Sequence, residues 1–227
     1  MENKQLKVLR NGRWQPMFRP VNPDRSFSGV NLGEFFADAY SKAHPDVAVG
    51  LIPCADGGTS LDQWQVGSLL YDHAVCQARL ALRTSHIVGV LWHQGESDCS
   101  NDRYPLYRQK FQVIMEALRK DLDLQDVPFL LGGLGDYLLH CDRMTDTGNY
   151  KFVNEQLRAM AQECPMTGYV SAEGLGSNPD MLHFSAEALQ EFGHRYYDVF
   201  ETLENRNKVY AEKPEMDGAI RSELELL

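Results

Sequence analysis

Asp180 and His183 have the spacing that most directly allows acid–base chemistry in this sequence. They lie three positions apart in the polar segment GLGSNPDMLH, residues 174–183, just before an expected helix. An aspartate placed in this way can orient an imidazole and stabilise its charged form, as a general base requires. Because DxxH is a common pattern, a second interpretation stays open, in which Asp180 caps a turn and His183 packs on the sheet. The position on a strand-to-helix loop favours the chemical one.

Paired glycines in ADGGTS, residues 55–60, offer a different kind of group. After a buried strand, such a pair lets a backbone N–H approach a ligand closely, and that N–H could help to form an oxyanion hole. A plain tight turn is the alternative. The segment lacks the GxGxxG pattern and the lysine of a phosphate-binding loop, so it does not predict nucleotide binding.

The densest polar cluster is WHQGESD, residues 92–98. Gln94 could donate an amide N–H to an oxyanion, and Glu96 could bind a substrate hydroxyl or support the histidine. A solvated loop is the alternative for Glu96 and Asp98. A metal site would use His93, Glu96 and Asp98, but strand alternation places His93 and Gln94 on opposite faces, and no second histidine has ligand spacing. We therefore predict no metal.

A nucleophile is not evident. The sequence has no GxSxG elbow, and residues 135–137 place a tyrosine where a GDS motif would have serine. Cys54 ends an expected strand, where a small buried hydrophobic residue is the more common role. Five loop serines have no distinguishing context: Ser26, Ser28, Ser60, Ser97 and Ser177.

Strands alternate with helices along most of the chain. Apolar, β-branched runs predict buried strands at residues 47–54, 87–93, 127–134 and 168–172. Apolar residues at helical spacing predict helices at residues 69–83, 104–120, 150–163 and from Ser185, as N-cap, to about 203. This alternation predicts an α/β fold with a mostly parallel sheet. Ligands bind beyond the carboxyl ends of such strands, where all four polar segments fall.

The start of the chain fits this pattern less well. A helix is expected over residues 30–43, capped by Ser28 and followed by Pro45. Before it, residues 6–10 and 13–18 flank Asn11-Gly12, which predicts a small hairpin excursion and not a buried central strand. The strand that should precede the helix is therefore expected upstream.

Composition limits the class of protein. The 227 residues suffice for one domain, which we expect over residues 1–204, with residues 205–227 as a loosely docked or disordered tail. A net charge of −10 argues against nucleic-acid or anionic-membrane partners. No apolar run reaches membrane-span length, and the polar N-terminus lacks a signal-peptide core. Five cysteines without a CxxC pair predict reduced thiols in a cytoplasmic protein.

Three of these segments, in this order, carry a family resemblance: IPCADGGTS at residues 52–60, WHQGESD at 92–98 and DMLHFS at 180–185. Together they resemble the sialate O-acetylesterase and acetylxylan esterase group of the SGNH hydrolases, from about Val8 to Phe200. The resemblance implies a flavodoxin-like three-layer α/β/α fold and hydrolysis of acetylated carbohydrate without metal or cofactor. It implies His183 as general base, Asp180 as its orienting partner, and the Gly58 backbone and Gln94 side chain as oxyanion donors, with Glu96 nearby.

One block of that family is absent. Its Gly-Gln-Ser-Asn motif, which follows the first strand and supplies the nucleophilic serine, has no counterpart here. We therefore expect an N-terminally truncated esterase, with its first strand and serine upstream. The alternative is a catalytically inactive carbohydrate-binding protein of the same fold. Xylan, sialic acid and other acetylated glycans all remain open as substrates, and the sequence does not indicate an oligomeric state.

Overall fold

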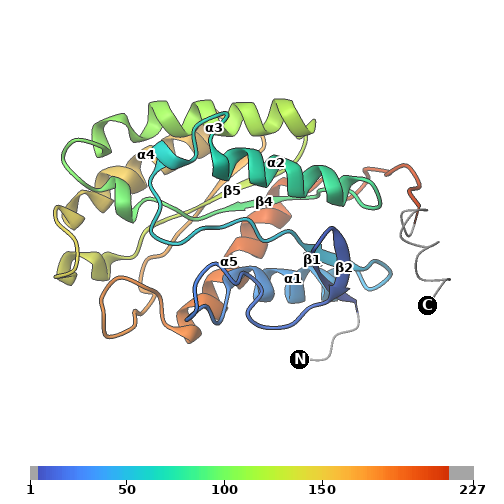
Figure 1. Cartoon of the computed structure of the whole chain (residues 1–227), viewed down its shortest axis with the longest axis horizontal. Coiled ribbons are helices and arrows are strands. Elements are labelled where there is room, and N and C mark those ends of the chain that lie inside the picture. The colour runs from blue at the N-terminus through green and yellow to red at the C-terminus, as the bar shows by residue number, and fades with distance from the viewer. Residues whose placement is uncertain (1–4, 215–227) are drawn as a thin grey trace.

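Helices cover both faces of a central layer of strands in the computed structural model, which describes residues 5–214 (Figure 1). Helices α1 and α5 lie on one face, and α2, α3 and α4 on the other. Their bounds are Leu32–Ala43 for α1, Leu69–Leu82 for α2, Tyr107–Leu122 for α3, Tyr150–Glu163 for α4 and Ala186–Leu203 for α5. The alternating pattern predicts this α/β class, and the family resemblance implies the flavodoxin-like three-layer α/β/α arrangement.

The central layer consists of two three-stranded sheets. The first has the order β2-β1-β3, and its strands span Leu6–Arg10 (β1), Arg13–Pro16 (β2) and Val49–Leu51 (β3). The second has the order β4-β5-β6, with all pairs parallel, and its strands span Val90–Trp92 (β4), Phe129–Gly132 (β5) and Thr167–Val170 (β6). Within residues 5–214, β3 and β4 are both edge strands, and no ladder joins the two sheets.

We call the line between β3 and β4 the seam. The strand at the seam is less buried than its neighbour. Val90 and Leu91 of β4 are only half-buried, whereas Leu130 and Leu131 of β5 are fully buried. Helices bridge the seam, because α1 packs on β3 and α5 packs on β5 and β6. Phe36 of α1 meets Phe200 of α5 edge to face, with ring centroids 5.5 Å apart. The two sheets are therefore held in one layer by helix packing.

The hairpin prediction at the start needs correction. Residues 6–16 do form a hairpin, but β1 is no excursion: it pairs with β2 on one side and in parallel with β3 on the other. Leu6, Val8 and Leu9 are buried. The side-chain pattern of a five-residue strand next to a turn did not reveal the second, long-range pairing.

Of the two predicted N-caps, Ser28 for the first helix was wrong and Ser185 for the last helix is confirmed. The N-cap of α1 is Asn31, whose side chain accepts from Gly33 N while Glu34 bonds back to the Asn31 N–H. Ser28 instead bonds to Asp24. At α5, Ser185 is the N-cap, and its hydroxyl accepts from Ala188 N. The predicted helix over residues 150–163 matches α4.

The described part of the tail, residues 205–214, packs against the chain. Lys213 Nζ donates to Leu82 O at the end of α2, and the ring of Tyr210 lies 4.8 Å from that of His86. The remainder of the predicted tail lies outside the described residues. None of the helices in residues 5–214 is long and apolar enough to cross a membrane.

Candidate active site

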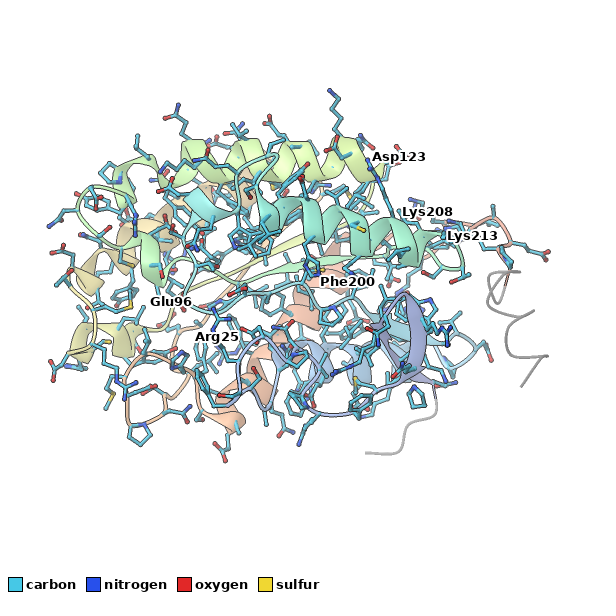
Figure 2. All side chains as sticks on the ribbon, in the orientation of Figure 1. Arg25, Glu96, Asp123, Phe200, Lys208 and Lys213 are labelled. Carbon is cyan, nitrogen blue, oxygen red and sulfur yellow. The ribbon has the colours of Figure 1, made fainter. Side chains whose placement is uncertain are left out.

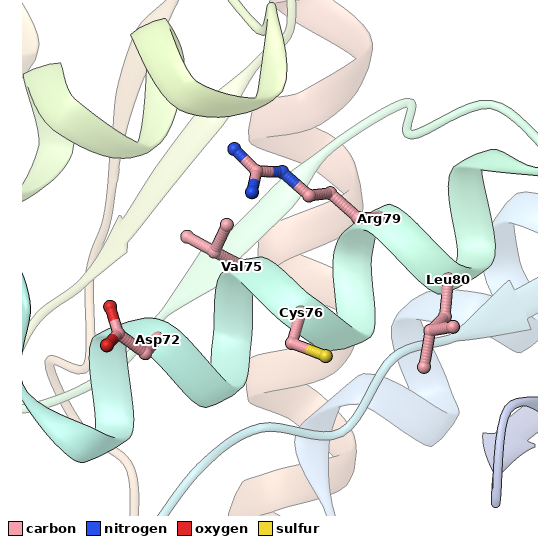
Figure 3. Close-up of a pocket in the computed structure, with 5 residues that line it drawn as sticks. All are labelled: Asp72, Val75, Cys76, Arg79 and Leu80. Carbon is pink, nitrogen blue, oxygen red and sulfur yellow. The ribbon is translucent and has the colours of Figure 1, made fainter.

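The predicted site residues gather at the carboxyl ends of the strands. Figure 2 labels Glu96 and Arg25 towards one end of the molecule, and Asp123, Lys208 and Lys213 towards the other. The loops after β3 and β4 are in direct contact there, because Gln94 Nε2 donates to Thr59 O at 3.0 Å. Two cavities of about 340 Å³ lie elsewhere and contain no predicted site residue. One is lined by α2 (Figure 3), and the other lies beneath the tail.

Asp180 and His183 form the predicted pair. The carboxylate Oδ2 of Asp180 lies 2.7 Å from His183 Nδ1, and its Oδ1 accepts from the backbone N–H groups of Leu182 and His183 at 3.0 and 3.1 Å. Burial acts to raise the pKa of Asp180, but these hydrogen bonds lower it to about 2. The turn is tight enough to place Met181 at φ 52°. Asp180 is therefore an ionised partner that holds Nδ1, while the His183 side chain is 60% exposed and its Nε2 has no hydrogen-bond partner among the described residues.

Glu96 lies on the side of the site that belongs to β4. Its Oε1 is 3.3 Å from His93 Nε2. Burial raises the pKa of Glu96, but the hydrogen bond from His93 and the charges of His93 and His183 lower it below its usual value. The loop of His183 is anchored in the same place, because Phe184 packs against His93 at a centroid distance of 5.4 Å. Glu96 and His183 are therefore close enough for the charge of His183 to act on the Glu96 carboxylate.

Gln94 is buried and turned towards the loop after β3. Its Nε2 donates to Thr59 O and, at 2.6 Å, to Asp98 Oδ2, so both amide protons have protein acceptors. Its Oε1 is buried without a partner among the described residues. Donation to an oxyanion would require one of these two bonds to be shared or exchanged.

Gly58 has the left-handed backbone that its residue type permits. Its φ is 77°, and an added Cβ would meet no atom within 4 Å, so backbone strain and not space disfavours other residues. Its carbonyl accepts from Ser97 Oγ at 3.2 Å. Its N–H has no hydrogen-bond partner in residues 5–214, and it is available to a ligand.

The three side chains of the metal alternative do not converge. Asp98 is fully buried and accepts from Leu61 N at 2.9 Å and from Gln94, while His93 contacts Glu96. No group of three His, Cys, Asp or Glu side chains within the described residues is arranged to hold a metal ion.

None of the loop serines in the described chain donates to His183. Ser97 bonds to Gly58 O, Ser28 to Asp24 and Ser177 to Met181 Sδ. Cys54 is an unpaired thiol, and burial raises its pKa to about 12, so it is not a thiolate near neutral pH. The described residues thus hold an aspartate–histidine pair, and none of these serines or Cys54 is hydrogen-bonded to His183.

Two arginines at the site were not predicted. Arg25 donates to the Asp56 carboxylate and to Gly57 O, and Arg143 Nη1 lies 3.8 Å from Asp180 Oδ2. Both come from irregular segments far from their partners in sequence, and neither has a local pattern that could have marked it. The structure also shows an outward-facing aromatic residue, Phe27, 79% exposed, on the segment that carries Arg25.

Comparison with known proteins agrees with this fold. Residues 2–202 match the family described as carbohydrate esterase, sialic acid-specific acetylesterase. The probable carbohydrate esterase At4g34215 of Arabidopsis thaliana is 29% identical over 195 residues, which cover 83% of this chain and 71% of that protein. Its crystal structure superimposes with a TM-score of 0.78 at 28% identity over 88% of this chain and 82% of the other.

Two more distant structures share the fold. A carbohydrate acetylesterase from Xanthomonas citri, XAC1771, has a TM-score of 0.64 at 19% identity, covering 89% of this chain and 50% of the other. NanS has a TM-score of 0.69 at 18% identity, covering 87% of each chain.

The fold is therefore the mixed α/β fold that these solved structures share. The chain belongs to the family of carbohydrate esterases described as sialic acid-specific acetylesterases.

Proposed function

We propose that this protein hydrolyses O-acetyl esters on carbohydrate by a serine mechanism, with His183 as general base and Asp180 as its orienting partner. The observation that supports this most is the 2.7 Å contact between Asp180 and His183 Nδ1, which leaves Nε2 of this 60% exposed side chain without a hydrogen-bond partner among the described residues. A base held in one tautomer, with its second nitrogen open, is what proton transfer from a serine hydroxyl requires.

The reaction would have two stages. A serine Oγ attacks the acetyl carbonyl while His183 Nε2 takes its proton, and the sugar hydroxyl leaves with that proton. Water then attacks the acetyl-enzyme while His183 takes its proton; the bond from the acetyl carbon to the serine Oγ breaks, Oγ takes that proton from His183, and acetic acid leaves as acetate. The Gly58 N–H, helped by the Gln94 amide after exchange of one of its bonds, stabilises the oxyanion of each tetrahedral intermediate. Glu96 binds a substrate hydroxyl or supports the histidine.

We expect the serine on a further strand, paired between β3 and β4. Both flanking strands present an unpaired edge within the described residues. Several polar atoms beside the seam are buried without partners there, among them Gln94 Oε1, Asp98 Oδ1 and His93 Nδ1. Such atoms cost free energy unless a further group satisfies them, and a strand seated in the seam would supply donors and acceptors.

Acetylated sialic acid and acetylated xylan are the two carbohydrates that we would compare first as substrates. The description of the family supports the former, and the resemblance of the sequence motifs also includes the latter. We take residues 1–204 as the catalytic unit, which the match over residues 2–202 supports. We also propose a cytoplasmic location, in keeping with five unpaired cysteines.

The test is hydrolysis of 4-nitrophenyl acetate and of acetylated sugars by four proteins. These are the chain itself, the chain extended at its N-terminus by a strand ending in Gly-Gln-Ser-Asn, and the His183→Ala variant of each. We expect turnover by the extended protein, with at least about a hundredfold loss on His183→Ala. Turnover that His183→Ala leaves unchanged would contradict the proposed base. Sugar binding without turnover by both unmutated proteins would indicate a binding protein instead.

A further inference from the structure

An irregular segment before α1, residues 22–28, is hydrogen-bonded along its length to the loop after β3. Asn22 Nδ2 donates to Ala55 O at 2.9 Å, and Asp24 Oδ2 accepts from Gly57 N at 2.8 Å. Arg25 Nη2 donates to Gly57 O at 2.5 Å and also to the Asp56 carboxylate. These are contacts across more than 30 positions of sequence, so they fix one loop against the other.

The segment is itself braced. Asp24 Oδ1 accepts from Asn22 Nδ2 and from Ser28 Oγ, both at 2.9 Å, and Ser28 Oγ accepts from Arg25 N at 3.0 Å. Asp24 therefore cannot turn away from Gly57 without breaking bonds at both of its oxygens. These bonds fix the backbone at Arg25, from which its side chain reaches the glycine pair.

Arg25 bonds to one half of the peptide group that contains the Gly58 N–H. The Gly57 carbonyl and the Gly58 N–H belong to the same planar, trans unit, so they point in opposite directions. A guanidinium that holds Gly57 O thereby sets the direction of the Gly58 N–H. The hydrogen bond also polarises the unit, which makes the N–H a stronger donor.

A glycine pair needs such a restraint. With no Cβ on either side, the peptide between Gly57 and Gly58 can rotate at little steric cost, and the rotated form would aim a carbonyl where the N–H now points. On the far side, Ser97 Oγ bonds only to Gly58 O. Arg25 is the side chain that bonds to the rotating group itself.

We propose that Arg25 is a positioning residue that locks the Gly57–Gly58 peptide so that the Gly58 N–H faces the substrate. The inference rests on the proposed function insofar as that N–H receives the oxyanion. Asp56 assists by holding the guanidinium, and Asn22 and Asp24 fix the segment from which Arg25 extends. Preorganised donors matter because they need no rearrangement as charge develops.

The experiment compares Arg25→Gln and Arg25→Lys with the unmutated protein. The matched control is Arg108→Gln, which removes another exposed arginine–carboxylate pair, with Glu163. Three quantities are measured in the chain extended by the strand that ends in Gly-Gln-Ser-Asn: the ¹⁵N order parameter of the Gly58 amide, and kcat and KM for an acetyl ester. Arg25 is on the surface, so the variants should fold, which circular dichroism checks.

For Arg25→Gln we expect the order parameter to fall from about 0.85 to below about 0.6. We expect kcat to fall about tenfold or more with KM nearly unchanged, since an oxyanion donor acts in the transition state. Arg25→Lys should recover part of both, and Arg108→Gln should change neither. An unchanged order parameter in folded Arg25→Gln would overturn the proposal, as would a mobile Gly58 with normal kcat. If the unmutated enzyme shows no turnover, the proposed function fails, and the order parameter alone decides whether Arg25 locks the peptide.

Discussion

Asp180 has partners for both carboxylate oxygens, and this governs how it responds to acid. The imidazole of His183 and two backbone N–H groups all favour its charged form. Folding lowers its pKa from 3.8 to about 2. A carboxyl whose folded pKa is depressed stabilises the fold fully above its unfolded pKa, and that contribution disappears as the pH falls through the folded value.

We therefore predict a pH-dependent effect of Asp180→Asn. The variant should unfold at a lower temperature than the unmutated protein above about pH 5, with a loss of about 1 to 2 kcal/mol from the missing hydrogen bonds. The difference should shrink between about pH 4 and pH 2, as Asp180 itself becomes protonated. Calorimetry across this range measures it. Asp142→Asn serves as control, because Asp142 is exposed and precedes Arg143 in the sequence. A difference in stability that stays constant down to pH 2 would contradict the lowered pKa of Asp180.

Local spacing was enough to find Asp180 and His183, because the bond between them spans one turn. It was not enough for Arg25 or Arg143, whose partners lie 31 and 37 positions away. Gln94 shows the converse limit. Its position was predicted, yet only the structure shows that both amide protons already have acceptors in Thr59 and Asp98.

An aromatic ring of the β1–β2 hairpin packs against the backbone of a glycine in β3. Trp14 of β2 lies over Gly50 of β3, so close that a Cβ on Gly50 would overlap the indole ring. Trp14 Nε1 also donates to Thr84 Oγ1 at 3.2 Å, near the end of α2. The Trp14 side chain thus connects the first sheet to the helical layer that contains α2.

Gly50→Ala should therefore destabilise the fold by about 1 to 3 kcal/mol, the usual cost of forcing an extra carbon into a packed contact. Gly29→Ala is the control, since a Cβ there meets nothing within 4 Å. Chemical denaturation measures both. Adding Trp14→Leu to Gly50→Ala should recover part of the loss, because the two positions are coupled. Strictly additive effects would show that the overlap is not the cause.

Elements could be predicted best where the pattern was long. The helix α4 and the cap of α5 followed from apolar periodicity and a serine in place. Strand lengths were overestimated: the apolar run at residues 47–54 yields only Val49–Leu51, which pairs with Leu6–Val8 although β1 itself continues to Arg10. Apolar side chains show that a segment is buried, but not how many of its backbone groups pair with a neighbouring strand.

The seam between β3 and β4 separates two sheets that differ in strand pairing and burial. β5 has a parallel neighbour on each side and is fully buried, whereas β3 pairs only with β1 within the described residues. Local opening costs least where few ladder bonds and few buried contacts must break. The second sheet should therefore be the more stable part.

Native-state hydrogen exchange should separate the two sheets. We expect the amides of Phe129–Gly132 in β5 to exchange only through global unfolding, and those of Val49–Leu51 in β3 to exchange faster through a smaller opening. Mild denaturant distinguishes the two routes, because only the global one accelerates steeply. Equal protection in β3 and β5 would show that α1 and α5 couple the sheets into one cooperative unit.

The seam also has a mechanical consequence. Across a continuous sheet, hydrogen bonds would keep the loops after β3 and β4 at a fixed separation, whereas here helix packing and a few loop contacts resist shear between them. Gly58, the proposed backbone oxyanion donor, follows β3 on one side of the seam, and His183, the proposed base, follows β6 on the other. A strand seated between them would stiffen the layer and deliver the serine in the same event, so that the groups become aligned only when the nucleophile is present.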